Sequence, residues 1–142
     1  MTTRTRTRPQ RPQGPKDIAL LCMAAAQRKK AFDLLLLEVG PLCGYTDYLM
    51  LASGRSTRQA GAIAEGIAHA LKKAGIKPLG QAGLKEGRWA LIDFGDVVVH
   101  VFHEPVREFY DLESLWSDAP RVAVDEDQLE GLLPPDTETS WA

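Results

Sequence analysis

The chain has 142 residues, of which 44% are hydrophobic and 25% are charged, and its formal net charge is −2 at pH 7. This length is sufficient to bury the core of one domain, and the composition is that of an ordinary soluble protein. No stretch approaches the ~20 consecutive apolar residues of a membrane span, and two cysteines argue against a disulfide framework, so a cytoplasmic location is expected.

The charges are distributed unevenly along the chain. Residues 1–16 carry five positive side chains and no acid, whereas residues 117–142 carry one positive side chain and seven acids. Neither segment has many large apolar residues to bury, so we expect a disordered basic arm at 1–16 and a flexible acidic tail at 117–142. The domain proper is then expected at 17–116. The arm is either a solvated terminus or a weak, sequence-independent RNA contact through its arginines.

The first half of the domain predicts a helix, two strands and a second helix. Asp17 is a candidate N-cap for a helix ending near the cations at 28–30. The runs 32–39 and 48–52 are short and continuously apolar, which is typical of strands covered on both faces. Ser56 and Gln59 fit a capping box, and apolar residues then recur at helical spacing up to Gly75. Gly61 and Gly66 within this helix predict close approach of the helix to the sheet.

The second half predicts a sheet edge, a hairpin and a short helix. Residues 78–84 indicate a weak edge strand, and the segment 87–103 contains two apolar runs around a Phe94-Gly95-Asp96 corner. A glycine between β-branched runs is typical of a hairpin. Side-chain alternation then places Trp89, Leu91 and Asp93 on one side of the first strand. A short helix follows Pro105. The order of elements predicts a single α/β domain with one mixed sheet of about five strands.

No complete catalytic or metal-binding set is visible in the sequence. His100 and His103 point to opposite faces of a strand, and Asp93 and Asp96 straddle a turn with no third acid placed to join them. Glycine-rich phosphate loops are also absent from the sequence. We therefore expect no enzyme activity, no metal and no cofactor. Trp89 is either a core residue or part of a protein interface, where tryptophan and arginine dominate binding energies.

Three segments resemble the ribosomal silencing factor family, also called the Iojap or RsfS family. These are TDYLMLASGRSTRQAGAIAE, KKAGIKPLGQAGLKEGRWALIDFGDVVVHVF and VREFYDLESLW, and the resemblance as a whole runs from about Asp17 to Trp116. The resemblance implies a nucleotidyltransferase-like fold without the catalytic carboxylates. It implies that the chain binds the fourteenth protein of the large ribosomal subunit, blocks subunit joining and represses translation under nutrient limitation. Free members of the family are often dimers.

Carried over residue by residue, the resemblance places the partner surface at Trp89, Asp93 and Phe94. Leu91 is added because alternation puts it on the face of Trp89, whereas alternation turns Phe94 to the other face. Asp96 is added because the partner's face is expected to be basic. The alternative from another class is a degenerate nucleotidyltransferase-like protein that still binds nucleotides, suggested by the fold analogy and the acidic corner.

Overall fold

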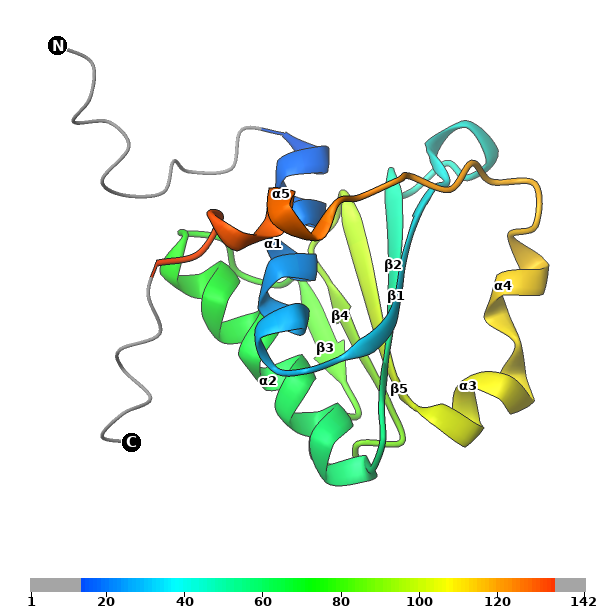
Figure 1. Ribbon diagram of the computed structural model, residues 1–142. Helices are drawn as coiled ribbons and strands as arrows, with labels where there is room; N and C mark the ends of the chain where they lie inside the picture. Colours follow the sequence, from blue (N-terminus) through cyan, green and yellow to red (C-terminus); the bar gives the residue numbers. More distant parts are fainter. Residues whose placement is uncertain (1–13, 135–142) are drawn as a thin grey trace, which may run out of the picture.

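The chain folds around a five-stranded mixed sheet that carries helices on both faces (Figure 1). The computed structural model describes residues 14–134, and its strands lie in the order β1-β2-β5-β4-β3. Their bounds are β1 (Phe32–Glu38), β2 (Tyr48–Gly54), β3 (Gly80–Ala82), β4 (Trp89–Asp93) and β5 (Val97–His103). β2 and β5 are parallel, and the other neighbouring pairs are antiparallel. The predicted fold class is confirmed.

The two faces of the sheet are covered by different helices. On one face lie α1 (Pro15–Arg28), α2 (Thr57–Lys73) and α5 (Glu126–Glu130), and on the other lie α3 (Glu104–Tyr110) and α4 (Leu112–Leu115) (Figure 1). A short 3-10 helix, η2 (Gly40–Leu42), connects β1 to β2. None of the helices within residues 14–134 has the length and hydropathy needed to cross a membrane.

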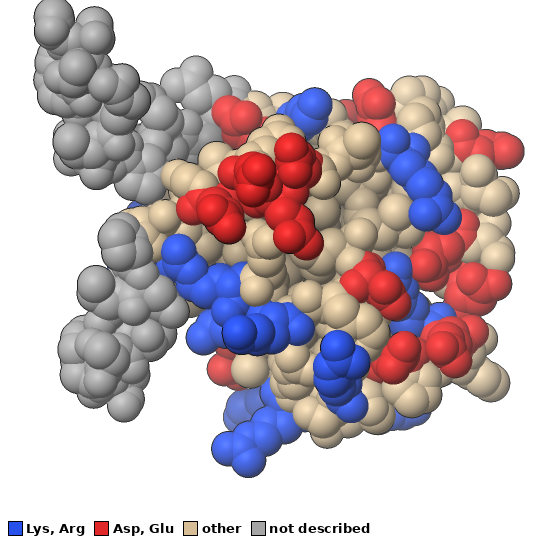
Figure 2. Space-filling view, viewed as in Figure 1, with Lys and Arg blue, Asp and Glu red and all other residues tan. Residues whose placement is uncertain are grey.

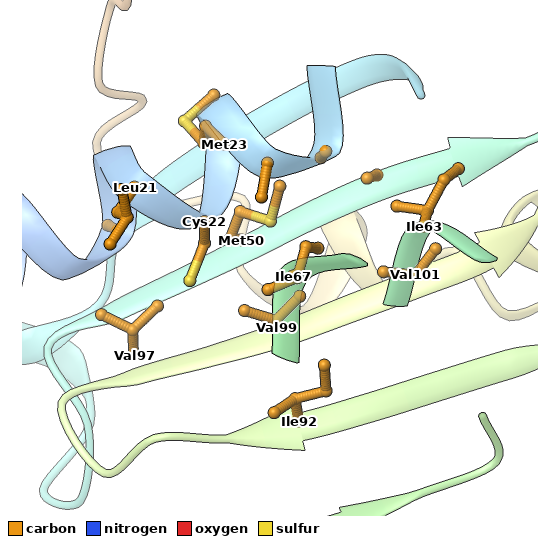
Figure 3. Close-up of a cluster of buried hydrophobic side chains, with 14 of the residues drawn as sticks. Leu21, Cys22, Met23, Met50, Ile63, Ile67, Ile92, Val97, Val99 and Val101 are labelled. Carbon is orange, nitrogen blue, oxygen red and sulfur yellow. The ribbon is translucent and has the colours of Figure 1, made fainter. Parts of the chain in front are cut away.

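Successive side chains of β5 point to opposite faces of the sheet and belong to two hydrophobic clusters. Val97, Val99 and Val101 point toward α1 and α2, where they form one cluster with Ile63, Ile67 and Ile92 (Figure 3). Val98 and Phe102 point the other way and pack with Val106 of α3. A strand buried on both faces reads as a continuous apolar run, which explains the valine-rich sequence.

The hairpin from β4 to β5 forms at the predicted corner. Phe94 N–H donates to the Val97 carbonyl at 2.9 Å, and Gly95 has φ +91°, which a side chain would make unfavourable. Asp93 Oδ1 accepts from the Gly95 N–H at 2.8 Å and fixes the turn. The strand pairing sets Trp89 opposite Phe102 and Leu91 opposite His100.

The helix α2 begins at the predicted cap. The Ser56 hydroxyl accepts from the Gln59 N–H at 3.0 Å, but the Gln59 side chain accepts from the Arg55 N–H rather than from that of Ser56. Gly61 is buried, and a Cβ there would lie 2.7 Å from the Leu84 carbonyl oxygen. The absent side chain therefore lets the segment before β4 approach the helix, so the close neighbour is a loop rather than the sheet that the sequence predicts.

The helix α1 differs from the expectation in its start and in its burial. Gly14 is the N-cap and Pro15 opens the first turn, so Asp17 lies inside that turn, where its charge suits the helix dipole. Every residue from 19 to 26 is buried rather than a single stripe. The reason is that α1 packs against the sheet, α2 and α5 together, which its alanines permit.

Residues 117–134, expected to begin a loose tail, pack onto the domain. The Glu38 N–H donates to the Pro120 carbonyl and the Val122 N–H donates to the Leu36 carbonyl, each at 2.9 Å, so this segment covers the outer edge of β1. α5 follows with its own capping box, and Leu129 is buried in the core. The predicted end of the domain at residue 116 is wrong. The segment that follows is held to β1 by backbone hydrogen bonds, and residue composition does not reveal such bonds. Residues 1–13 of the predicted arm and 135–142 of the tail lie outside the described residues.

Candidate functional site

The face of the sheet opposite α1 and α2 is only partly covered. Along β4, Ala90 and Ile92 are completely buried against the helices, whereas Trp89, Leu91 and Asp93 on the other side are half-buried. The predicted alternation is therefore confirmed. It leaves an indole, an aliphatic side chain and a carboxylate together at a surface.

The indole of Trp89 is held in one orientation by its neighbours. Its Nε1–H donates to Nδ1 of His100 at 2.9 Å. Its ring centroid lies 4.9 Å from that of Phe102 on β5 and 4.9 Å from that of Tyr110 on α3, both tilted contacts. Aromatic pairs at such distances contribute about 0.5–1.5 kcal/mol each beyond the area they bury. Trp89 is thus a fixed, partly exposed ring rather than a mobile one.

His100 supports this geometry as a neutral side chain. Burial lowers the pKa of His100 to about 4, so the imidazole is uncharged near pH 7. Because Nδ1 accepts the indole N–H, the ring hydrogen is assigned to Nε2. His100 is 8% exposed and lies beneath the aromatic cluster, so its role here is to position Trp89.

The structure separates the remaining predicted site residues. Phe94 is 8% exposed and belongs to the core on the α1 and α2 side, so it does not share a surface with Trp89. Asp96 is exposed in the hairpin turn, and its carbonyl accepts from the N–H groups of Asp47 and Tyr48 at 3.0 Å. Of the five predicted residues, Trp89, Leu91 and Asp93 share one face, with Asp96 at its end.

The helices α3 and α4 add apolar residues that the sequence reasoning did not assign to the site. Phe109, Tyr110 and Leu115 are 80%, 51% and 77% exposed, and the Phe109 ring meets the Tyr110 ring edge-on at 5.0 Å. The adjacent pair Phe109-Tyr110 was the available signal, because a seven-residue helix cannot bury both rings against one sheet. We call the surface formed by these residues the Trp89 face: Trp89, Leu91, Asp93, Phe109, Tyr110 and Leu115.

A buried arginine fixes α3 and α4 over the sheet. Arg107 Nη1 donates to the Asp33 carbonyl of β1 and to the Ser53 hydroxyl of β2, both at 2.7 Å. Its Nη2 and Nε donate to Glu113 Oε2 of α4 at 2.9 and 3.3 Å. Charge-assisted hydrogen bonds of this kind are stronger than neutral ones. Arg107 therefore fixes the position of α3 and of the two aromatic side chains that it carries, Phe109 and Tyr110.

Acidic side chains lie at the hairpin turn and around α3 and α4. Asp93 and Asp96 lie at the turn end, and α3 and α4 bring further carboxylates around an open cavity of about 490 Å³ next to Arg107. The carboxylates that line this cavity are Asp33, Glu104, Glu108, Asp111 and Glu113. Arg107 and Arg121 also line the cavity, but Arg107 is paired with Glu113, so carboxylates predominate and the lining favours a basic partner over nucleotide phosphates.

Within residues 14–134, no three His, Cys, Asp or Glu residues are grouped closely enough to hold a metal ion. Cys22 is buried in α1, which raises the pKa of its thiol far above the usual range and leaves it an unreactive thiol. An apolar face with fixed aromatic rings and an acidic rim suits recognition of a protein surface.

The comparisons with known proteins agree on one family. A family model described as "Ribosomal silencing factor during starvation" matches residues 12–141. The chain is similar to "Ribosomal silencing factor RsfS" of Bacillus subtilis, with 41% identity over 110 residues, 78% of this chain and 93% of the relative. It also resembles the mouse "Mitochondrial assembly of ribosomal large subunit protein 1", with 33% identity over 71% of this chain and 45% of that protein.

A solved structure supports the same relationship. The crystal structure of a protein from Chromobacterium violaceum superimposes with a TM-score of 0.73 and 35% sequence identity. The match covers 82% of this chain and 98% of the other. The topology described above is therefore shared along nearly the whole length of that protein.

Proposed function

The chain belongs to the ribosomal silencing factor family, and from this premise we propose that it binds the large ribosomal subunit and represses translation. The finer step of the proposal is that the Trp89 face docks on the fourteenth protein of the large subunit. Joining of the small subunit is then blocked sterically. This role needs no catalysis by the chain, and it places the protein in the cytoplasm with the ribosomes.

One observation carries the proposal: the sheet has one sealed face and one face that displays a fixed tryptophan. Trp89 is held by His100, Phe102 and Tyr110, so little conformational freedom is lost when a partner covers it. Tryptophan and tyrosine are the residues most enriched among binding hot spots. The surrounding carboxylates complement a basic partner and speed the encounter.

The size of the surface is compatible with a specific complex. Stable protein interfaces bury about 800 Å² per partner. The Trp89 face combines strand β4 with two helices, and its exposed rings and aliphatic side chains come from α3 and α4. The apolar side chains would form the centre of the interface and the carboxylates its rim.

Sedimentation of purified large subunits with the protein tests this proposal. The parent should pellet with the large subunit, whereas Trp89→Ala and Phe109→Ala should each weaken binding by tenfold or more, as expected for hot-spot residues. Phe109 is 80% exposed, so its removal should leave the fold intact. Glu130→Ala, an exposed residue of α5 beside the other face, is the matched control and should bind as the parent does. Full binding by both Trp89 and Phe109 variants would reject this surface.

The free protein offers a related proposal. Exposed rings on the Trp89 face are unfavourable in water, so self-association through that face would cover them when no ribosome is present. Gel filtration at several concentrations should then show a dimer that Phe109→Ala weakens. A monomer at every concentration would reject self-association through the Trp89 face and leave the ribosome as its proposed partner.

A further inference from the structure

The opposite side of the molecule carries a second charged surface. On α2, the exposed stripe includes Arg58 and Lys72, whose spacing of 14 residues returns them to one side of the helix. Lys77 follows α2, and Lys30 follows α1. Between Gly54 and Lys85 the sequence has one acid, Glu65, which is exposed and lies on the same stripe midway between Arg58 and Lys72, so the cations of this surface outnumber its acid. We call this surface the basic face: Lys30, Arg58, Lys72 and Lys77.

Packing between α1 and α2 brings these cations onto one surface. Gln59 Nε2 on α2 donates to the Lys30 carbonyl at 3.1 Å. A Cβ at Gly66 would lie 2.9 Å from Lys29 Cε, so the aliphatic stem of Lys29 runs across α2 at that glycine. Figure 2 shows Lys and Arg gathered over α2 and the end of α1, whereas acidic side chains gather over α5.

The helices that carry the basic face expose no large apolar side chain within residues 14–134, and Leu79, two residues after Lys77, is the nearest such residue in the sequence. The large hydrophobic side chains exposed within residues 14–134 are Leu42, Tyr45, Leu79, Phe109, Tyr110 and Leu115, and none of them lies on α1 or α2. Membrane-surface helices anchor through large apolar side chains, and protein interfaces rely on aromatic hot spots. A polar surface of lysine and arginine without such anchors matches a phosphate backbone instead.

We propose that the basic face binds the phosphate backbone of RNA. α2 has 17 residues and is about 25 Å long, enough to follow several consecutive phosphates. Contacts from long, flexible cations read charge rather than base sequence, so the binding is sequence-independent. The inference rests on the proposed function only in naming ribosomal RNA as the natural source of that backbone.

The two faces can act together because they lie on opposite sides of the sheet. The basic face belongs to the helices covering one side, and the Trp89 face lies on the other (Figure 1). One molecule can therefore hold a protein with one face and an RNA segment with the other. The affinity for the ribosome would then have a salt-dependent part that the Trp89 face does not supply.

A charge-neutralised variant of the full chain tests the inference. In Arg58→Gln/Lys72→Gln/Lys77→Gln, three exposed cations of the basic face are removed without touching the core. The matched control is Lys16→Gln/Lys85→Gln/Arg121→Gln, which removes three exposed cations outside it. Binding to a fluorescent 20-base-pair RNA duplex is measured by anisotropy from 50 to 300 mM KCl, and large-subunit binding is measured by sedimentation over the same range.

Each phosphate contact contributes about 0.7–0.9 to the slope of log affinity against log salt. The slope should therefore become shallower by about 2 for the basic-face variant and remain nearly parental for the control. Equal slopes for the two variants on RNA would overturn the inference. So would binding to phosphatidylserine vesicles that exceeds binding to RNA.

The large-subunit measurements separate this inference from the proposed function. If the parent binds the RNA duplex through these residues but does not sediment with large subunits, the ribosomal proposal fails and the RNA inference stands. If the parent sediments with large subunits and the basic-face variant keeps the parental salt slope on both the RNA duplex and the large subunit, the inference fails and the ribosomal proposal stands. Trp89→Ala should keep the parental RNA affinity, because it lies on the other face.

Discussion

Replacing Arg107 by methionine tests whether one buried guanidinium holds the helices of the Trp89 face in place. The Arg107 side chain is 9% exposed, and its partner Glu113 is 29% exposed. Removing the cation leaves the Ser53 hydroxyl and the Asp33 carbonyl without their donor and strands the Glu113 carboxylate.

The magnitude follows from these contacts. A hydrogen bond to a charged group contributes about 1.5–3 kcal/mol. Water can reach Glu113 and the exposed Asp33, so it partly replaces the hydrogen bonds that these two residues lose. Ser53 is 1% exposed, so water compensates least for the bond that its hydroxyl loses. We therefore expect the free energy of unfolding to fall by about 3 kcal/mol, which lowers Tm by about 10 °C in a domain of this size.

Urea unfolding gives the assay, with the m-value as a check that both proteins unfold in two states. The matched control is Glu108→Gln, an exposed neighbour on α3, which should change stability by less than about 0.5 kcal/mol. The Arg107→Met/Glu113→Gln double variant should lose less free energy of unfolding than the two single variants lose together, because it leaves no carboxylate without its cation. A loss below about 1 kcal/mol for Arg107→Met would refute the reasoning.

Three other predictions concern the pH response, the C-terminal segment and nucleotide binding. The pKa of His100 is about 4 in the folded protein and about 6.5 in the unfolded chain. The stability that the neutral imidazole gives the folded state is therefore fully present above pH 6.5 and is lost as the pH falls toward 4. His100→Gln keeps an acceptor for the Trp89 indole but cannot titrate. Between pH 7 and 4 the parent should therefore lose up to about 3 kcal/mol more than this variant in chemical denaturation; identical losses would contradict the account. Leu129→Ala should lower the free energy of unfolding by about 2–3 kcal/mol, because Leu129 is buried where α5 packs, whereas no change would indicate a loose tail. Magnesium with ATP should leave Tm unchanged in a thermal-shift assay, because carboxylates line the cavity beside Arg107, and a concentration-dependent rise would support the nucleotide-binding alternative.

Local chemistry was enough to predict the hairpin and the second helix. The valines of β5 and the glycine of the corner specify strand, turn and strand, and Ser56 specifies the start of α2. These features are determined by residues that are neighbours in the sequence, so local sequence patterns are enough to predict them. The burial of Ala90 and Ile92 against the half-exposure of Trp89 follows from alternation along one strand.

The parts that were missed depend on contacts between distant segments. Arg107 reaches Asp33, 74 positions away, and this contact decides that α3 stands over the sheet and exposes Phe109. The strand-like segment near Arg121 pairs through its backbone with β1, which side-chain composition does not indicate. The resemblance places Phe94 in the site although alternation turns it to the other side, and the structure follows the alternation.

The most direct test of the central proposal measures subunit joining itself. Purified small and large subunits are mixed at a magnesium concentration that favours joining, and light scattering follows the joined particle as the protein is titrated in. We predict that the parent, added before the small subunit, lowers the yield of joined ribosomes in proportion to its occupancy of the large subunit, and that Trp89→Ala does so only at far higher concentration. Undiminished joining at a concentration where sedimentation shows the large subunit fully occupied would contradict the account.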